Sequence, residues 1–171
     1  MSAEDRTTLL SSLPCPELLL CVRAGGETDV ATVTAMWVSY EPVIAAVYLR
    51  PGTTAHRLVT TAREFTLNLV GEAQDRAALT AGSLSGSDPD KLSKLGLEFT
   101  APRAVESPRI KGAAAHYECR VVGITPCGSH DLILGVVTAW DAPGGTPVIR
   151  YGHRSHRLGE PIPGPDVAYP H

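Results

Sequence analysis

The feature that most constrains the fold of this chain is a series of apolar segments separated by turn residues. ELLLCVR, DVATVTAMWVS and PVIAAVYLR, residues 17–23, 29–39 and 42–50, alternate with period two or are continuously apolar, which predicts three β-strands. Gly25 and Gly26 favour a hairpin turn between the first two. Further strand candidates follow: FTLNLV, AHYECRVVGITP, HDLILGVVTAWDA and TPVIRYG, residues 65–70, 115–126, 130–142 and 146–152, of which the second and third form a predicted hairpin.

Only a few segments have helical character. AEDRTTLLSSL, residues 3–13, predicts a short helix that ends before the first prolines. AHRLVTTAREF, residues 55–65, places apolar residues at helical spacing behind Thr53 or Thr54, either of which can cap the helix. The polar stretch 71–97 predicts one or two short helices joined by a surface loop.

The order of these segments predicts a mainly β protein, a β-barrel with inserted helices. Strands follow one another without βαβ alternation, which favours antiparallel pairing in a closed or nearly closed barrel. We expect residues 1–171 to form one domain, with residues 1–12 as an N-terminal helix or arm. Residues 160–171 are rich in proline, and we expect this C-terminal tail to be extended.

Charge and cysteine content exclude several partners. The formal net charge is −3 and the pI is about 6.0, so a nucleic-acid partner is not expected. The apolar run near the N-terminus is broken by Pro14 and Pro16, which fits neither a signal peptide nor a membrane span. Four cysteines in mostly apolar surroundings are typical of free thiols in a reducing compartment, so we expect a cytoplasmic protein.

A metal site is the first chemistry to weigh. His116, Cys119, Cys127 and His130 have the right side chains for zinc. On a strand, however, residues three apart point to opposite faces, so His116 and Cys119 converge poorly on one ion, and we expect no metal. The G-x-S-x-G, Walker A and G-x-G-x-x-G patterns are also missing from the sequence.

The start of the helix predicted after residue 54 is a candidate anion site. Arg50, Thr53, Thr54, His56 and Arg57 gather there, and a helix N-terminus offers free N–H groups and partial positive charge. Hydroxyls and cations at that point suit a phosphate. In the alternative interpretation, Thr53 is only a helix cap and the arginines only form a solvated face.

Several motifs in the same order resemble the flavin reductase-like family. They are VATVTAMWVSYEP, RPGTTAHRLVTTAREFTLNLV, SGSDPDKLSKLGLEF, YECRVVGI and GSHDLILGVV. The resemblance extends from Leu13 to about Gly159 and is strongest to the flavoredoxin-type branch. It implies a six-stranded Greek-key barrel, the FMN-binding split barrel, in a homodimer that binds FMN, or sometimes FAD, near the subunit interface.

The same resemblance implies residue roles. The segment Thr34, Ala35, Met36, Trp37, Val38 and Ser39 would run along the isoalloxazine and ribityl chain, with Ser39 as the best hydroxyl contact. Arg50, Thr53, Thr54 and His56 would hold the phosphate. Asn68, Ser85, Gly86 and Lys91 would line or close the flavin pocket.

His130 is the expected residue at the reactive edge of the flavin. The resemblance places it where it can meet a nicotinamide or a substrate, with a role in positioning and in proton or charge management. Capping of the strand end is the alternative. Two departures affect the mechanism: Gly135, Val136 and Val137 replace the family's Gly-Glu-Val, and Glu41, Pro42 and Val43 replace Asp-Pro-Pro.

The resulting expectation is an NAD(P)H-dependent flavin oxidoreductase that transfers hydride from NADH or NADPH to FMN or FAD. A flavin-dependent monooxygenase is the partner that we expect to receive the reduced flavin. The alternatives are an FMN-holding electron carrier without a nicotinamide donor, and a barrel that uses its pocket for another ligand or a non-redox reaction. Trp37 and Trp140 are expected in the core or in the dimer interface, because an indole buries a large area.

Overall fold

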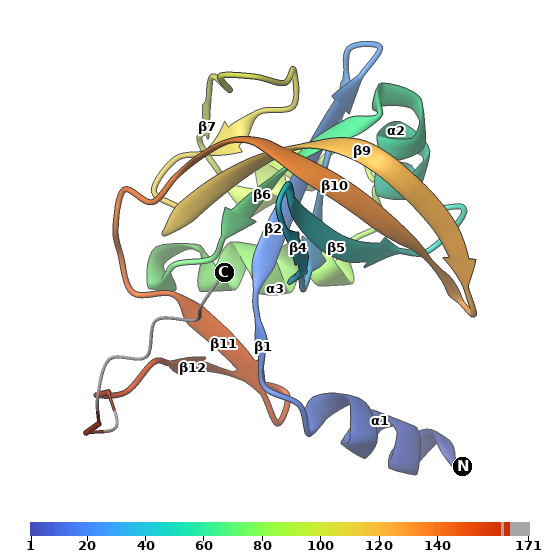
Figure 1. The fold of residues 1–171 in the computed structure, drawn as a ribbon. Helices are drawn as coiled ribbons and strands as arrows, with labels where there is room; N and C mark the ends of the chain where they lie inside the picture. Colours follow the sequence, from blue (N-terminus) through green and yellow to red (C-terminus); the bar gives the residue numbers. More distant parts are fainter. Residues whose placement is uncertain (162, 165–171) are drawn as a thin grey trace.

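The computed structural model describes residues 1–161, 163 and 164. Its first element, α1 (Ala3–Ser11), is capped by Ser2, whose Oγ accepts a hydrogen bond from the backbone N–H of Asp5 at 3.0 Å. The helix has no buried residue and extends away from the body of the protein (Figure 1). The helix predicted at the N-terminus is therefore present, whereas residues 162 and 165–171 of the predicted tail lie outside the described residues.

Seven strands form one antiparallel sheet in the order β3-β2-β6-β9-β10-β5-β4. The chain passes from edge strand β3 to the opposite edge strand β4 through Thr34 and Ala35 alone. The three Cα–Cα steps from Val33 to Met36 span at most about 10 Å, so the two edges must approach each other and the sheet must curl into a barrel. The strands are β2 (Leu18–Ala24), β3 (Glu27–Val33), β4 (Met36–Tyr40), β5 (Val43–Leu49), β6 (Glu64–Leu69), β9 (Ala115–Cys127) and β10 (His130–Asp141).

The mainly β prediction is confirmed, with one correction to the strand count. The single strand expected over residues 29–39 is divided into β3 and β4, which adds a seventh strand to the six expected. The cause is that β3 pairs with β2 whereas β4 pairs with β5, so the chain has to change sheet edge between them. Sequence periodicity does not show this crossing, because both halves are apolar and β-branched.

The two predicted hairpins are confirmed. Gly25 and Gly26 have φ angles of +57° and +84° at the turn between β2 and β3. The β9–β10 hairpin lies between β6 and β5, which gives the sheet its Greek-key order. Two register shifts in the β9–β10 pairing, one in each strand, increase the curvature of the hairpin. A Cβ atom on Gly135 would lie 2.6 Å from the Phe65 ring, so only glycine fits there.

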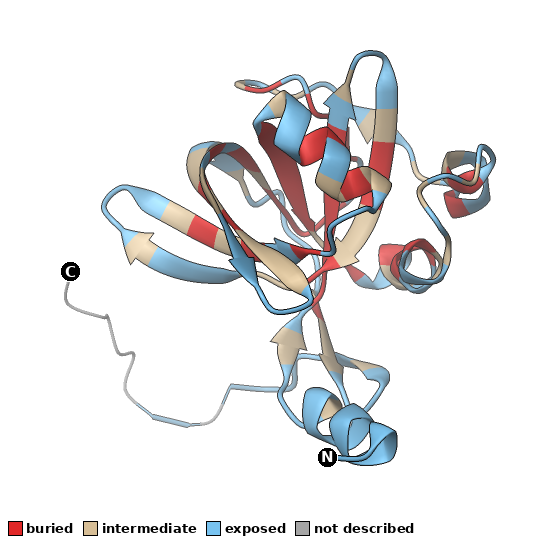
Figure 2. Ribbon diagram, turned by 90° about the vertical axis from the view of Figure 1, so that its right-hand side faces the viewer, coloured by how far each residue is buried: buried red, intermediate tan, exposed pale blue. Residues whose placement is uncertain are grey.

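Two apolar clusters cover opposite faces of the central strands (Figure 2). The barrel interior contains Leu20, Val22, Val47, Phe65 and other residues, and α2 (Thr54–Ala62) packs onto it. On the other face, Leu19 and Cys21 pack with residues of α3 (Asp75–Ser83) and α4 (Lys91–Leu95). Because both faces are covered, β2 is continuously apolar instead of alternating.

A small extension lies below the barrel in Figure 1. Its three strands, in the order β1-β11-β12, connect the arm to the body. The strand predicted within residues 146–152 is present, whereas its partner β12 was not predicted because Arg-Ser-His-Arg has no apolar alternation.

Among the described helices, none is long and apolar enough to cross a membrane. The remaining elements are β1 (Cys15–Pro16), η1 (Glu72–Gln74), β7 (Phe99–Thr100), β8 (Arg109–Ile110), β11 (Val148–Tyr151) and β12 (Arg154–Arg157).

Candidate functional site

The N-terminus of α2 is built by a tight turn after β5. Thr53 is the cap, and its Oγ1 accepts a hydrogen bond from the backbone N–H of His56 at 3.3 Å. The backbone N–H and the hydroxyl of Thr53 both donate to the Arg50 carbonyl, at 3.3 and 2.8 Å. Gly52 has a φ of +86°, which closes this turn. Of the two predicted caps, Thr53 is the one used, and Thr54 is the first helical residue.

A cavity of about 370 Å³ lies beside this helix N-terminus, and we call it the α2 cavity. The Arg50 side chain is exposed at its edge and forms no ion pair or hydrogen bond within the described part of the chain. A free guanidinium next to a helix N-terminus gives the cavity an anion-binding character. The predicted site residues that line it are Arg50, Thr53, Thr54, Ser85, Gly86, Lys91 and His130.

Lys91 enters this cavity as half of a buried ion pair. Its Nζ lies 2.7 Å from Oδ1 of Asp29, and the two side chains are 5% and 4% exposed. Lys91 is therefore not solvated, although most lysines are. Asp29 belongs to β3 and Lys91 begins α4, so the pair ties the polar segment before α4 to the barrel wall.

Gly86 lies where this segment comes closest to the wall. A Cβ atom there would overlap the Thr54 side chain and lie 2.6 Å from Asp29 Oδ2. The absence of a side chain thus allows residues 84–87 to pass directly over the helix start. Gly86, Thr54 and Asp29 form one packed corner of the cavity.

His130 opens β10 immediately after the turn made by Gly128 and Ser129. Its Nδ1 lies 2.8 Å from the Ser129 hydroxyl, and its ring stands nearly perpendicular to Tyr48, with centroids 5.7 Å apart. The residue both begins the strand and lines the α2 cavity. The two interpretations of His130, strand end and site residue, are therefore compatible.

His56 is turned away from the α2 cavity. Its Nε2 lies 2.8 Å from Oδ2 of Asp131, and the two side chains are mostly buried. His56 does not line the cavity, although it belongs to the same helix turn as Thr54. Asp131 is the residue after His130, so the pair fastens α2 to the start of β10.

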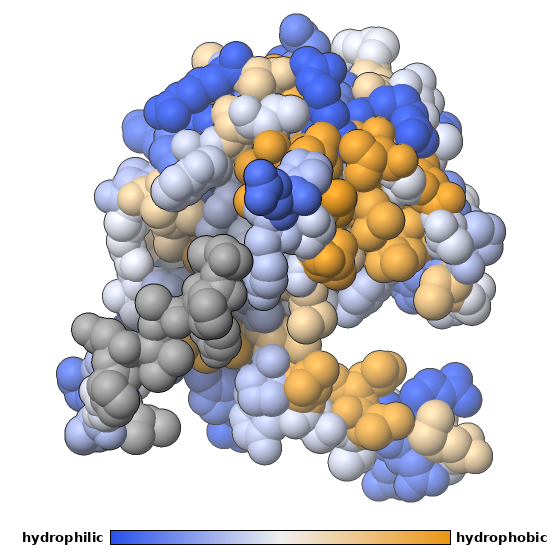
Figure 3. Space-filling view, in the orientation of Figure 1, coloured by the Kyte–Doolittle hydropathy of each residue, from blue (hydrophilic) through white to orange (hydrophobic). Residues whose placement is uncertain are grey.

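A second cavity of about 350 Å³ lies between the arm and the barrel, and we call it the arm cavity. It shares Thr32, Val33 and Tyr48 with the α2 cavity, so the two adjoin. Figure 3 shows the molecule hollowed between α1 and the apolar face above it. Of the predicted site residues, only Thr34 lines the arm cavity, together with residues that were not predicted: Glu17, Tyr48, Arg150 and His153.

The rest of the segment 34–39 lies elsewhere. Ala35, Met36 and Trp37 line a third, smaller cavity of about 160 Å³, where Trp37 meets Tyr117 edge to face at a centroid distance of 5.0 Å. Val38 and Ser39 line none of these three cavities. The structure therefore spreads the predicted ring-binding segment over two cavities.

Asn68 and the tryptophans have different surroundings from those expected. Asn68 is 1% exposed, donates to the Leu19 carbonyl at 3.0 Å and accepts from the Ile110 N–H at 2.8 Å. The structure does not bring it to any of the three cavities. Trp37 and Trp140 are 43% and 64% exposed, so the prediction of a core position is wrong and the interface prediction remains.

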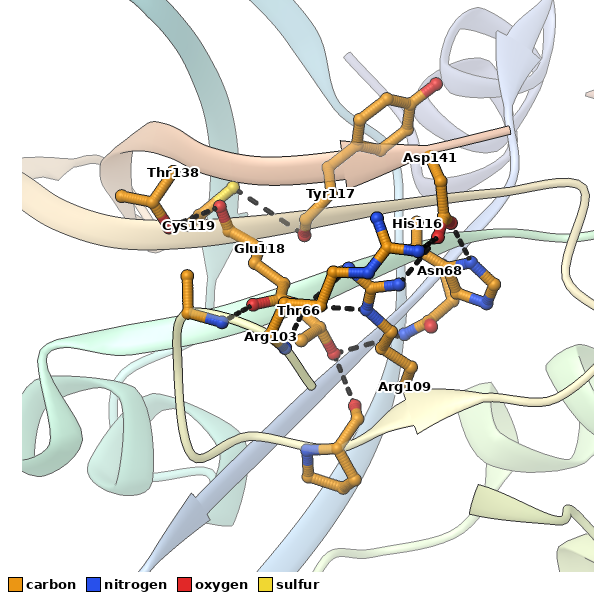
Figure 4. Close-up of polar contacts among 12 residues, drawn as sticks. Thr66, Asn68, Arg103, Arg109, His116, Tyr117, Glu118, Cys119, Thr138 and Asp141 are labelled. Carbon is orange, nitrogen blue, oxygen red and sulfur yellow. Dashed lines mark hydrogen bonds and ion pairs between the residues drawn. The ribbon is translucent and has the colours of Figure 1, made fainter. Parts of the chain in front are cut away.

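A separate network of buried charges involves the candidate zinc ligand His116 (Figure 4). Its Nδ1 lies 2.7 Å from Asp141 and its Nε2 lies 2.8 Å from the Ile110 carbonyl. Arg109 joins Asp141 to Glu118, which also accepts the backbone N–H groups of Arg103 and Ala104. These contacts fix the loop before β8 against β9.

The predicted divergence of His116 and Cys119 is confirmed. Cys119 packs in the barrel interior, whereas His116 lies in the charge network on the other face of β9. Within residues 1–161, 163 and 164, no group of three or more potential metal ligands is found.

The chain is similar in sequence to several known proteins. A protein of Pyrococcus abyssi that is itself uncharacterized is 31% identical over 140 residues, 77% of this chain and 80% of that protein. The reductase component of a 4-nitrophenol 4-monooxygenase/4-nitrocatechol 2-monooxygenase from Rhodococcus opacus is 28% identical over 128 residues, 72% of this chain and 64% of that protein.

Solved structures show the same fold. An NADH:FAD oxidoreductase of Streptomyces globisporus C-1027 superposes with a TM-score of 0.79 at 20% identity, and covers 94% of this chain and 97% of its own. The family model described as "Flavin reductase like domain" matches residues 10–159. The chain therefore belongs to the flavin reductase-like family and has its split-barrel fold.

Proposed function

We propose that this protein is an NAD(P)H-dependent flavin oxidoreductase that binds FMN and takes its reducing equivalents from NADH or NADPH. The observation that carries the proposal is the α2 cavity, which combines a helix N-terminus, threonine hydroxyls and the unpaired Arg50 guanidinium. Family membership supports flavin chemistry in general, and the site residues are inferred from the cavity.

The α2 cavity suits the phosphate of FMN. Lys91 is neutralised by Asp29, so Arg50 is the uncompensated cation among its lining side chains. Thr54 and Ser85 add hydroxyls, and the free N–H groups of the first turn of α2 add donors. A phosphate monoester satisfies all of these groups, whereas a neutral ligand would leave Arg50 unpaired.

The ring system would extend from there past Thr32 and Tyr48 into the arm cavity, because these residues are shared by both cavities. Thr34 would contact the ring, and Ala35 from the crossing and Met36 and Trp37 from β4 would flank it. Bound FMN would supply the hydride acceptor of the reaction. FAD is the alternative flavin, and the Streptomyces relative is named for its use of FAD and NADH.

His130 would position the nicotinamide donor. It lines the α2 cavity and its ring contacts Tyr48, which belongs to both cavities, so it lies near the point where phosphate and ring sites adjoin. A histidine there can donate a hydrogen bond to the bound donor. The carboxylate next to it, Asp131, is occupied by His56 and is not free to assist.

The absent glutamate supports a second candidate function. Position 136 in β10 is valine where the family pattern has glutamate, so no carboxylate is available there for donor binding. A protein that holds FMN and exchanges electrons without a nicotinamide would tolerate this loss. A barrel adapted to another ligand is the third candidate, and it requires that no flavin binds.

We further propose a cytoplasmic homodimer that supplies reduced flavin to a monooxygenase. β4 and β5 expose large apolar side chains, among them Met36, Val38 and Tyr40 at 72%, 56% and 69%. Figure 3 shows an apolar patch over this part of the barrel. A contiguous apolar patch of this kind is typical of an interface. The Rhodococcus relative is named as the reductase component of a monooxygenase, and the four free cysteines support a reducing compartment.

The proposal is tested by titrating the purified chain with FMN and then adding NADH or NADPH without oxygen. We expect the flavin absorbance to bleach faster than in a protein-free control. Flavin that binds without bleaching would favour the electron carrier, and failure to bind would favour a repurposed barrel. Light scattering gives the oligomeric state.

Two variants assign the roles. Arg50→Ala should weaken FMN binding by about tenfold or more, because a charge-assisted hydrogen bond to phosphate is lost. Its matched control is Arg57→Ala, since Arg57 lies on the same helix but pairs with Glu27 at 2.7 Å outside the cavity. His130→Ala should slow flavin reduction more than it weakens FMN binding. Equal FMN affinity in the two arginine variants contradicts the phosphate assignment.

A further inference from the structure

Three hydrogen bonds link the turn at Arg50 to the start of β10. The Thr53 hydroxyl donates to the Arg50 carbonyl at 2.8 Å and accepts the backbone N–H of His56 at 3.3 Å. The ring Nε2 of His56 then lies 2.8 Å from Oδ2 of Asp131. Because Asp131 pairs with Leu49, the residue before Arg50, this chain of contacts closes on itself.

The contact between His56 and Asp131 is the side-chain link of this circuit between two separate elements. His56 belongs to the first turn of α2, and Asp131 belongs to β10. The two side chains are 16% and 17% exposed, so little water reaches the contact. An ionised carboxylate only accepts hydrogen bonds, so His56 carries a proton on Nε2. A hydrogen bond to a charged acceptor away from water holds both groups more firmly than a neutral one at the surface.

Asp131 and His130 project from opposite faces of β10. Side chains alternate along a strand, so neighbouring residues point to opposite sides. His130 accordingly lines the α2 cavity, whereas Asp131 is turned to His56. A movement of Asp131 therefore also moves the backbone that carries His130.

The other end of the contact lies at the phosphate end of the cavity. Thr53 and Thr54 line the α2 cavity and precede His56 in the same helix turn. Arg50 comes before them, and its carbonyl holds Thr53 in place. The contact thus joins the part of the cavity that the proposed function gives to the flavin phosphate with the part that it gives to the donor.

We propose that His56 and Asp131 are positioning residues, whose contact fixes the distance between the phosphate-binding turn and His130. Neither residue lines the α2 cavity, so neither would touch the flavin or the donor. The inference rests on the proposed function, which gives Arg50 and His130 their roles. A flavin anchored by its phosphate meets the donor correctly only if this distance is kept, because small displacements of reacting groups cost large factors in rate.

The test uses two flavins that differ only in the phosphate, FMN and riboflavin. Their reduction without oxygen, by whichever of NADH and NADPH bleaches the wild-type protein, is measured at saturating flavin, so that altered flavin affinity does not change the rate. In His56→Leu, the rate with FMN should fall about tenfold or more, and the rate with riboflavin less than about threefold. Riboflavin has no phosphate to tether it, so it can follow a displaced His130.

Further variants separate positioning from folding. His56→Gln should keep most of the wild-type rate with FMN, because the glutamine amide can still donate to Asp131. Asp131→Ala should reproduce the effect of His56→Leu, and the double variant should lose no more than either single variant, since all three remove the same contact. Asp131→Ala leaves the sequence of α2 intact, so it gives the same measurement if His56→Leu does not fold.

The matched control is Glu27→Ala. Glu27 accepts two hydrogen bonds, at 2.8 and 2.7 Å, from Arg57, the residue after His56 in α2. This contact fastens the same helix to β3, but neither of its residues lines the α2 cavity. Glu27→Ala should therefore leave the rates with both flavins unchanged.

An equal loss with FMN and riboflavin in His56→Leu would mark the contact as merely structural and overturn the inference. Wild-type rates in Asp131→Ala would overturn it as well. In both cases, bleaching of FMN by the wild-type chain leaves the proposed function intact. A wild-type chain that reduces neither flavin contradicts the proposed function, and the inference falls with it.

Discussion

The Nζ atom of Lys91 lies 2.7 Å from Oδ1 of Asp29, and water reaches little of either side chain. The pair crosses from the first residue of α4 to the middle of β3, so it closes one side of the α2 cavity. Asp29 Oδ1 also accepts the Val30 backbone N–H at 2.9 Å, which holds the carboxylate in place. The pair thus anchors the charged end of α4, while Leu95 packs the other end of the helix onto the core.

Lys91→Met should lower the free energy of unfolding by about 3 kcal/mol, because it leaves the Asp29 carboxylate buried without its partner. Unfolding in urea, followed by circular dichroism, gives this value. The FMN dissociation constant of the variant should also rise, since the segment over the cavity loses its anchor.

The control for this variant lies in the same helix. Lys94 pairs with Asp88 at 2.7 Å, but its side chain is 48% exposed. Lys94→Met should leave stability nearly unchanged, because an ion pair in water contributes little. If both variants lose the same stability, burial is not what makes the Lys91 pair important.

Gly86→Ala should weaken FMN binding by several-fold and destabilise the protein by about 1–3 kcal/mol, as expected for overpacking. The added Cβ atom would overlap Thr54 at the start of α2 and crowd Asp29, so the segment over the cavity must move outward. Fluorescence titration with FMN measures the first effect and thermal unfolding the second.

Gly82→Ala provides the matched control. Gly82 also lines the α2 cavity, but a Cβ atom there would lie at an ordinary 3.5 Å from Thr32. The residue lies within α3, where alanine is favoured over glycine. Retained stability in Gly82→Ala together with a loss in Gly86→Ala would show that the close approach matters; equal losses would refute it.

The strands could be predicted because each carries its own periodicity, and the helix at residues 54–62 because Thr53 and its apolar face are local signals. The crossing at Thr34 and Ala35 could not, because it depends on which strands pair at the two edges of the barrel. The arginine-rich strand β12 has no apolar pattern and exists through its pairing with β11.

In the candidate site, too, some residues could be predicted from local sequence and others depend on the fold. Arg50, Thr53 and Thr54 follow one another in the chain, so the sequence alone indicated their gathering at a helix start. Glu17 could not be predicted in this way. Its partner Arg150 lies in β11, near the far end of the chain, and only the folded structure brings the two residues together. A lone glutamate before an apolar strand gives no signal of this, and the partner of Lys91 was equally hidden.

The thiols should divide into two classes. Burial raises the pKa of Cys21 and of Cys119 to about 12, so neither forms a thiolate near neutral pH. Cys127 is exposed in the β9–β10 turn and Cys15 is partly exposed. Reaction with a thiol reagent at pH 8 should modify Cys127 first and spare Cys21 and Cys119 until denaturant is added. Four thiols reacting at one rate in the folded protein would contradict this.

The buried charge network should make the protein sensitive to acid. Burial alone would raise the pKa of Glu118, but backbone N–H groups of Arg103 and Ala104 and the Arg109 side chain hold it below its ordinary value (Figure 4). Burial likewise opposes ionisation of Asp141, whose pKa is nevertheless lowered by His116 and Arg109. Both carboxylates are therefore stabilised as anions in the folded protein.

A lowered folded-state pKa means that the unfolded chain binds more protons than the folded one as the pH falls below about 4 to 5, the ordinary carboxyl range. The stabilisation from Glu118 and Asp141 is thus complete at neutral pH and is lost as the pH drops through the lowered pKa values. Urea unfolding at a series of pH values should show this decline. Glu118→Gln should cost about 3 kcal/mol at pH 7, because Arg109 loses its fully buried anion and keeps only the partly exposed Asp141, and it should flatten the pH dependence. Glu98→Gln, at an exposed pair with Lys111, should change stability little. An unaltered acid limb in Glu118→Gln would assign the acid sensitivity to other carboxylates.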